Sequence, residues 1–179
     1  MEEFFANASV SAFVGAFSAF VLVIITDRRR LYRKRKVLRN VISDSGDHAR
    51  FKIDSVERNM ELVQAGKITA APIMRFPTET IRALQVEVID ILDANRNQAI
   101  SALLYWMAAI DDQLDKAVEK AEQIVAHERR DPQCVEKQHL YAEYKEILEE
   151  SLKNLRSLVQ LIAHYVSGQP ERIQEFTHE

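Results

Sequence analysis

The chain has 179 residues, of which 47% are hydrophobic and 28% are charged, so it can form one compact domain with an attached element. Its four glycines and four prolines are few for this length, which favours long helices over strands. The single cysteine, Cys134, excludes an internal disulfide framework and fits a reducing compartment.

The formal net charge of −3 is unevenly distributed along the chain. Residues 27–39, which we call the basic segment, contain eight Arg and Lys side chains and one Asp. Glu2 and Glu3 precede this segment, so residues 40–179 must carry a net charge of −8. The sequence therefore predicts an acidic main domain with one short basic attachment.

An uncharged stretch of 22 residues, from Phe4 to Ile25, lies directly before the basic segment. A helix of this length, at about 1.5 Å per residue, covers the roughly 30 Å hydrocarbon core of a bilayer. A cleavable signal peptide carries basic residues before its apolar core, whereas here Glu2 and Glu3 come first and the basic residues follow. We therefore predict an uncleaved signal-anchor in the form of a transmembrane helix. A buried soluble helix is the alternative.

The basic segment also predicts an orientation, because positive residues beside a span stay on the cytoplasmic side and attract the anionic inner leaflet. The expected location is the cell membrane, inner or plasma, with a single pass, the N-terminus outside and the C-terminal domain in the cytoplasm. The residues expected to bind the membrane surface are Arg28, Arg29, Arg30, Arg33, Lys34, Arg35 and Lys36.

Small residues recur at four-residue spacing within the uncharged stretch. The resulting helix face consists of Ser11, Ala12, Gly15, Ala16 and Ala19. Faces of this kind let two helices approach closely in lipid. The sequence is therefore compatible with a homo-oligomer formed through the transmembrane helix or through the bundle.

The helix that contains the basic segment is expected to end within "SDSGDH", residues 43–48. Gly46 suits the C-terminus of a helix, and Asp47 can cap the start of the next one. A second helix is then expected over about 47–65. The proline-containing residues 66–77 are expected to form the longest connection, because proline bars helix continuation.

The last two helices carry a regular heptad pattern. Apolar residues recur at alternating steps of three and four over residues 100–124 and again over residues 148–166, which keeps a seam facing a partner helix. A further helix, starting at Thr78 or Thr80 and breaking around residues 94–98, precedes them. We expect the two long helices to form an antiparallel hairpin roughly 50 Å long at 1.5 Å per residue.

The predicted fold is therefore all-α, with one N-terminal transmembrane helix followed by a cytosolic helical bundle that contains a long antiparallel coiled-coil-like hairpin. The predicted units are an N-terminal tail and transmembrane helix over 1–26, a basic juxtamembrane helix over 27–45, a cytosolic four-helix bundle over 46–168 and a C-terminal tail over 169–179.

No set of residues in the sequence identifies an active site. Glu136 and His139 match the Glu-x-x-His element of di-metal bundles, but such a site needs a second copy, which the sequence lacks. The carboxylates of Asp111, Asp112 and Asp115 could share a cation or an arginine, yet mid-helix carboxylates of this kind are expected to face water. We expect no catalytic residue, no metal site and no cofactor.

The favoured function is a non-enzymatic interaction, scaffold or regulatory module that is anchored in the membrane and binds an unidentified protein or a second copy of itself. One alternative is a membrane-held enzyme or effector whose active site the sequence does not reveal. Another is a self-assembling protein that perturbs the membrane. Nucleic acid is not an expected partner, because the basic segment lies against the bilayer and the acidic remainder would repel a polyanion.

Overall fold

The computed structural model describes the backbone of residues 2–69, 73–130 and 135–175, and the side-chain surroundings of residues 16–69, 73–127 and 138–173. All regular structure in these ranges is helical. The elements are α1 (Glu2–Gln64), α2 (Thr78–Val88), the short 3-10 helix η1 (Ile89–Ile91), α3 (Ala94–Arg130), α4 (Val135–Val166) and α5 (Glu171–Glu175).

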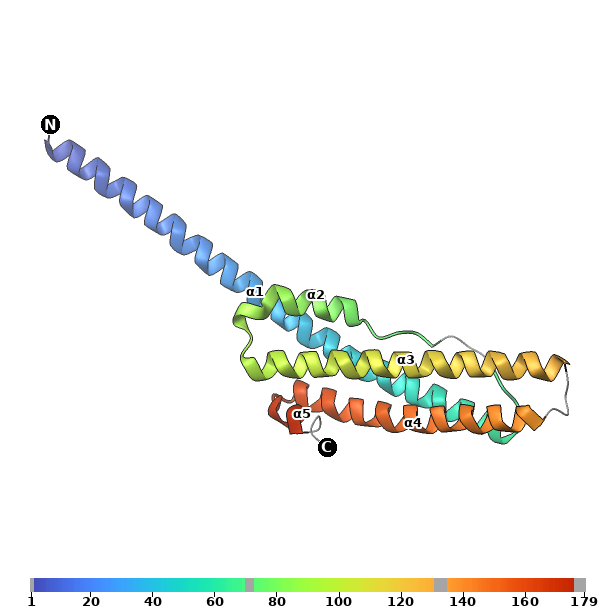
Figure 1. Ribbon diagram of the computed structural model, residues 1–179. Coiled ribbons are helices and arrows are strands. Elements are labelled where there is room, and N and C mark those ends of the chain that lie inside the picture. The colour runs from blue at the N-terminus through green and yellow to red at the C-terminus, as the bar shows by residue number, and fades with distance from the viewer. Residues whose placement is uncertain (1, 70–72, 131–134, 176–179) are drawn as a thin grey trace.

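The C-terminal half of α1 joins α2, α3 and α4 in an elongated bundle, while its N-terminal half projects away from the other helices (Figure 1). α1 packs against α4 and α2, and α3 packs against α4 and α2. α3 and α4 run antiparallel (Figure 1). The expected helical bundle and its long hairpin are confirmed.

The two ends of the bundle differ. α1 enters at the end where α3 begins and α4 and α5 finish, which we call the proximal end (Figure 1). α3 ends and α4 begins at the opposite, distal end (Figure 1). Any function of the basic segment must therefore be sought at the proximal end.

The heptad pattern of α3 marks its buried face. Its buried seam consists of Ile100, Leu103, Met107, Ile110, Leu114, Ala117, Ala121 and Ile124. α4 buries a wider face, since Leu158 and Leu161 are fully buried in addition to the expected Leu148 and Leu155. The reason is that α4 packs against both α1 and α3, so a single seam does not cover its contacts.

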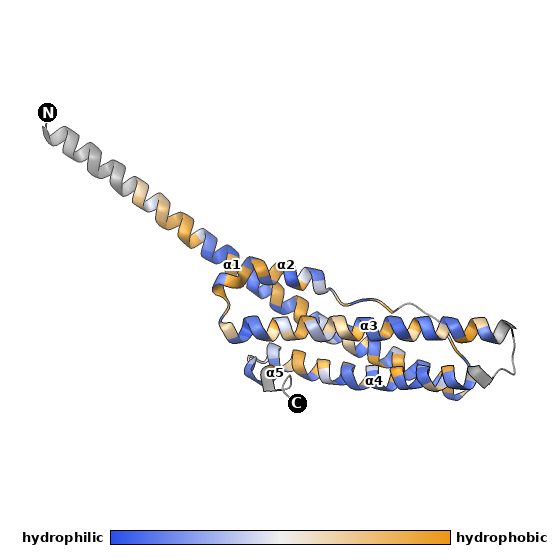
Figure 2. Cartoon of the chain, in the orientation of Figure 1, coloured by the Kyte–Doolittle hydropathy of each residue, from blue (hydrophilic) through white to orange (hydrophobic). Residues whose placement is uncertain are grey.

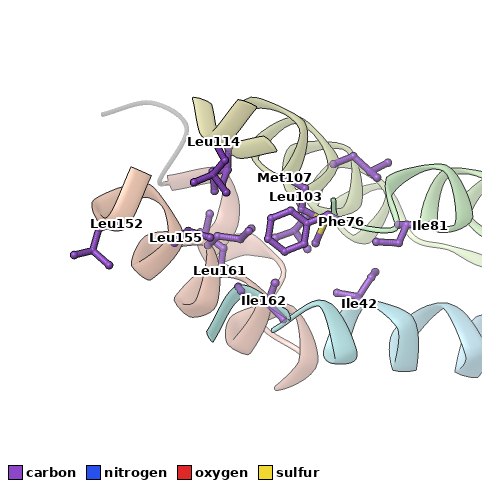
Figure 3. Close-up of a cluster of buried hydrophobic side chains, with 14 of the residues drawn as sticks. Ile42, Phe76, Ile81, Leu103, Met107, Leu114, Leu152, Leu155, Leu161 and Ile162 are labelled. Carbon is purple, nitrogen blue, oxygen red and sulfur yellow. The ribbon is translucent and has the colours of Figure 1, made fainter. Parts of the chain in front are cut away.

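Side chains from all four long elements meet in one core. Figure 3 shows Ile42 of α1, Ile81 of α2, Met107 of α3 and Leu155 of α4 among these buried side chains. Phe76, from the segment just before α2, is 4% exposed and belongs to the same cluster. The segment before α2 is therefore attached to the bundle by an aromatic side chain.

The expected helix end at Gly46 is wrong, because α1 continues without interruption to Gln64. Gly46 is buried where α1 crosses α4, and a Cβ atom there would lie 3.3 Å from Cγ2 of Ile162. Its neighbours Ser45 and Ala49 are also fully buried. This glycine therefore serves close approach of two helices rather than helix termination.

Two other glycines do end helices. Gly66 follows α1 with φ at 68°, and the N–H of Lys67 donates to the carbonyl of Leu62 at 2.8 Å. Gly168 follows α4 with φ at 83°, and the N–H of Gln169 donates to a carbonyl of α4 at 2.9 Å. Both are Schellman turns, which need the left-handed backbone conformation that glycine adopts without strain. The expected helix stop at Gly168 is confirmed.

The expected break around residues 94–98 lies slightly earlier in the structure. α2 begins at Thr78, one of the two predicted starts, and is followed by η1, which ends before Leu92. The carboxylate of Asp93 accepts a hydrogen bond from the backbone N–H of Arg96 at 2.8 Å and so caps α3. The cap explains why α3 begins at Ala94.

Candidate membrane-anchoring surface and basic pocket

The projecting part of α1 carries an apolar band outside the core. Every described side chain from residue 16 to residue 30 is exposed, and Phe17 and Leu22 are 60% and 66% exposed. Figure 2 shows this band followed directly by hydrophilic residues where α1 reaches the bundle. Large apolar side chains over residues 17–25 are therefore left uncovered by the described part of the chain.

Among the residues that the structure describes, no helix has a stretch long and apolar enough to cross a membrane. Ala16 and Ala19 of the expected small-residue face are exposed on α1, whereas Ser11, Ala12 and Gly15 lie outside the described side chains.

The basic segment divides into two groups of side chains. The exposed members are Arg28, Arg29, Arg30, Arg33, Lys36 and Arg39. Lys34 and Arg35 are half-buried, and the ammonium of Lys34 lies 2.7 Å from a carboxylate oxygen of Glu87 on α2. Lys34 is thus committed to a contact within the bundle, which sequence spacing alone did not indicate.

A pocket of about 370 Å³ opens at the proximal end, beside the basic segment. Its lining consists of Tyr32, Arg35, Lys36 and Arg39 from α1, Arg96 from α3, and residues 165–168 from the end of α4. Four of these side chains are cationic and none is a carboxylate. The pocket is therefore a concentration of positive charge at the meeting point of three helices.

Two guanidinium groups of this pocket are held by protein contacts. Nη2 of Arg39 donates to the carbonyl oxygen of Val166 at 2.6 Å, across 127 residues of sequence. Nη1 of Arg96 lies 3.3 Å from a carboxylate oxygen of Asp93, the residue that caps α3. Each guanidinium has five N–H donors, so both groups keep donors for a ligand after these contacts.

Tyr165 is a buried residue that lines the same pocket. Burial raises the pKa of the Tyr165 hydroxyl, and the nearby Asp93 raises it further, while Arg35 and Arg39 oppose the shift. The hydroxyl therefore remains protonated at neutral pH and can donate a hydrogen bond.

Sequence reasoning missed Arg96 and Tyr165 as members of this site. A signal was available, because an antiparallel hairpin must bring the start of α3 next to the end of α4. The distance between residue 39 and the end of α4 could not be predicted, since it depends on how α1 crosses α4.

A second polar feature lies inside the bundle. The Lys52 ammonium is 2.7 Å from Oδ1 of Asp111, and both residues are buried. Oδ2 of Asp111 accepts the backbone N–H of Phe76 at 2.9 Å, and the ammonium lies 4.4 Å from the centre of the Phe76 ring. Burial lowers the pKa of Lys52, and the contact with Asp111 opposes this effect.

The expectation that the carboxylates around Asp111 all face water is therefore wrong for Asp111. Asp112 is exposed as expected, and Asp115 forms an ion pair with Arg75. Asp111 and Asp115 hold the segment before α2 against α3, so we assign them a structural role.

The remaining candidate residues form no common site. Within the described ranges, no three metal-binding side chains are grouped. Nδ1 of His139 lies 3.2 Å from a carboxylate oxygen of Glu143, while Glu136 and Cys134 lie outside the described side chains. Trp106 packs half-buried against the core.

Comparison with known proteins adds no relative to this description. The chain matches no family model, no curated protein and no solved structure. The class of the protein, a helical bundle with a projecting helix that carries an apolar band and a basic segment, therefore rests on its own sequence and geometry.

Proposed function

We propose that the protein is a single-pass, membrane-anchored helical bundle that acts as a non-enzymatic interaction or scaffold module on the cytoplasmic side. The observation that supports this most directly is the unbroken course of α1. One helix runs from the uncovered apolar band through the basic segment into the bundle core. A bilayer is the environment in which such an apolar band is stable while the basic residues after it contact lipid headgroups.

The length of the uncharged stretch agrees with this proposal. Its 22 residues correspond to about 33 Å of helix, close to the thickness of a hydrocarbon core. In water the exposed residues Phe17, Phe20 and Leu22 would leave a large apolar surface uncovered, which favours membrane insertion.

The single cysteine provides a direct test of the topology. Cys134 lies between α3 and α4 in the sequence, so the proposal places it in the cytoplasm. A membrane-impermeant maleimide is expected to label Cys134 only after the cells are permeabilised. Labelling of intact cells to the same extent would contradict the proposed orientation.

A matched variant tests the other end of the chain. In a Cys134→Ser background, Glu3→Cys places the only thiol before the uncharged stretch. We expect this thiol to react with the same reagent in intact cells. Recovery of the protein in the soluble fraction, with neither thiol protected by a membrane, would refute anchoring altogether.

A further inference from the structure

The basic pocket combines four cationic side chains with protein contacts that fix two of them. Arg35 and Lys36 form no hydrogen bond or ion pair with the described residues, whereas Arg39 and Arg96 are fixed by their contacts with Val166 and Asp93. Planar guanidinium groups bind phosphate oxygens in pairs, and lysine adds a point charge. Four cations around one small pocket suit a doubly charged phosphate monoester better than a single carboxylate.

We propose that this pocket binds a phosphate-bearing anion, and that in the membrane the anion is a phosphorylated lipid headgroup. The proposal that the pocket binds phosphate depends only on the geometry of the pocket. The lipid origin of the phosphate rests on the membrane anchoring proposed above. A volume of about 370 Å³ is in the range of pockets that hold small ligands.

The position of the pocket along α1 indicates the kind of headgroup. Tyr32 and Arg39 lie seven and fourteen residues after Ile25, which corresponds to about 10 and 21 Å of helix. The polar layer of one leaflet is only about 5 to 7 Å thick. The pocket therefore opens just outside this layer, where it meets a phosphate carried outward on a sugar-type headgroup rather than one attached directly to glycerol.

A binding measurement on the detergent-solubilised full-length chain tests the pocket. The probe is fluorescently labelled inositol trisphosphate, and the readout is the dissociation constant from fluorescence anisotropy. The double variant Arg35→Gln/Lys36→Gln is expected to weaken binding by about tenfold or more, because it removes two charge-assisted contacts.

The basic segment offers a matched control with the same loss of charge. Arg28→Gln/Arg29→Gln alters two exposed residues of the same helix that do not line the pocket. We expect a change of less than about twofold from this pair, since general attraction to distant charges is screened by salt. Equal weakening by both pairs would overturn the proposal in favour of non-specific attraction.

Arg96 tests the contribution of α3 to the pocket. Arg96→Gln is expected to weaken binding by about tenfold, and Arg96→Lys to restore part of it. Asp93→Asn keeps a capping side chain but removes the carboxylate beside Arg96, so binding should be unchanged or tighter. Weaker binding by Asp93→Asn, or normal binding by Arg96→Gln, would contradict the assigned role of Arg96. Circular dichroism of each variant checks that the bundle is intact.

Competition experiments distinguish the two sources of phosphate. A short-chain phosphatidylinositol phosphate is expected to displace the probe better than the free headgroup, because its acyl chains lie beside the apolar band. Equal displacement by the free headgroup would assign the site to a soluble phosphate compound. Displacement of the probe by short-chain phosphatidylserine, which carries only a phosphodiester, as effectively as by the phosphatidylinositol phosphate would refute selectivity for a phosphate monoester. The maleimide labelling of Cys134 tests the proposed membrane anchoring independently of these binding results.

Discussion

Lys52 and Asp111 connect three parts of the chain through one buried ion pair. Asp111→Ala would leave the Lys52 ammonium and the Phe76 N–H without their acceptor, so we expect a loss of about 3 to 5 kcal/mol in the free energy of unfolding. Urea unfolding of the full-length chain, followed by circular dichroism, measures the change. The exposed neighbour provides the control, since Asp112→Ala should change stability by about 0.5 kcal/mol or less.

The same ion pair predicts a pH dependence. Burial lowers the pKa of Lys52 from its ordinary value of 10.5, so between the lowered pKa and 10.5 the unfolded chain holds a proton that the folded chain has released. The contribution of Lys52 to stability therefore rises with pH through this interval and is lost as the pH falls through it. We expect unfolding curves measured from pH 7 to about 10 to show a steeper rise for the natural protein than for Lys52→Met. Parallel curves would contradict the predicted shift.

Gly46 carries a prediction about helix packing. A larger side chain there must displace Ile162, whose Cγ2 lies 3.3 Å from the position of a Cβ. Gly46→Leu is expected to lower the free energy of unfolding by about 1 to 3 kcal/mol through overpacking. Ser43→Leu, at an exposed position of the same helix, should leave stability within about 0.5 kcal/mol. Similar effects of the two changes would argue against close contact of α1 with α4.

At the scale of elements, the continuity of α1 can be tested inside the stretch that resembles a turn. Asp44→Pro would remove a backbone hydrogen bond in the middle of the helix, and we expect it to cost about 3 kcal/mol or more. Thermal unfolding by circular dichroism gives the comparison with Asp44→Ala, which should be nearly neutral because Asp44 is exposed. If Asp44→Pro were tolerated as well as Asp44→Ala, the helix would have to be interrupted at or before residue 44.

The elements that could be predicted from the sequence are those with a local signal. The buried face of α3 follows from the spacing of its apolar residues, and the turn after α4 follows from one residue, Gly168. The structure contains both features. The role of Gly46 could not be predicted, because helix ends and close helix contacts both favour glycine and only Ile162, far along the chain, distinguishes them. The burial of Asp111 could not be predicted for a similar reason, because it depends on the ion pair with Lys52, which lies 59 residues earlier in the chain.

The candidate site also has one part that the sequence predicts and one part that depends on how the helices pack. The charges of the basic segment and their place after an uncharged stretch follow from the sequence alone. The pocket does not, because it forms only where α1, α3 and the end of α4 meet, and because Lys34 turns toward Glu87 instead of joining it. Tertiary geometry therefore decided which basic residues share a site.

At the scale of the whole molecule, the proposed anchoring together with the charge asymmetry predicts the orientation of the chain in the membrane. The triple variant Arg28→Gln/Arg29→Gln/Arg30→Gln weakens the positive charge after the apolar band, so a larger fraction of Cys134 should become reactive from outside the cell. Maleimide labelling of intact and permeabilised cells gives this fraction. Arg58→Gln/Lys116→Gln/Lys153→Gln removes the same charge from exposed positions of the bundle and should leave the labelling pattern unchanged. An equal shift by both triple variants would point to overall net charge instead of local position.

Under the proposed anchoring, the unbroken course of α1 also fixes the direction in which the bundle faces around the axis of the membrane segment. Each residue of an α-helix advances the chain by about 100° of rotation, so two residues inserted after Thr26 would turn the pocket by about 200° relative to the membrane segment. Seven inserted residues would return it to within about 20° while moving it about 10 Å farther from the membrane. For a chain anchored as proposed, the orientation of the bundle and its height above the bilayer are therefore separate quantities, and the number of residues between the apolar band and the bundle sets both.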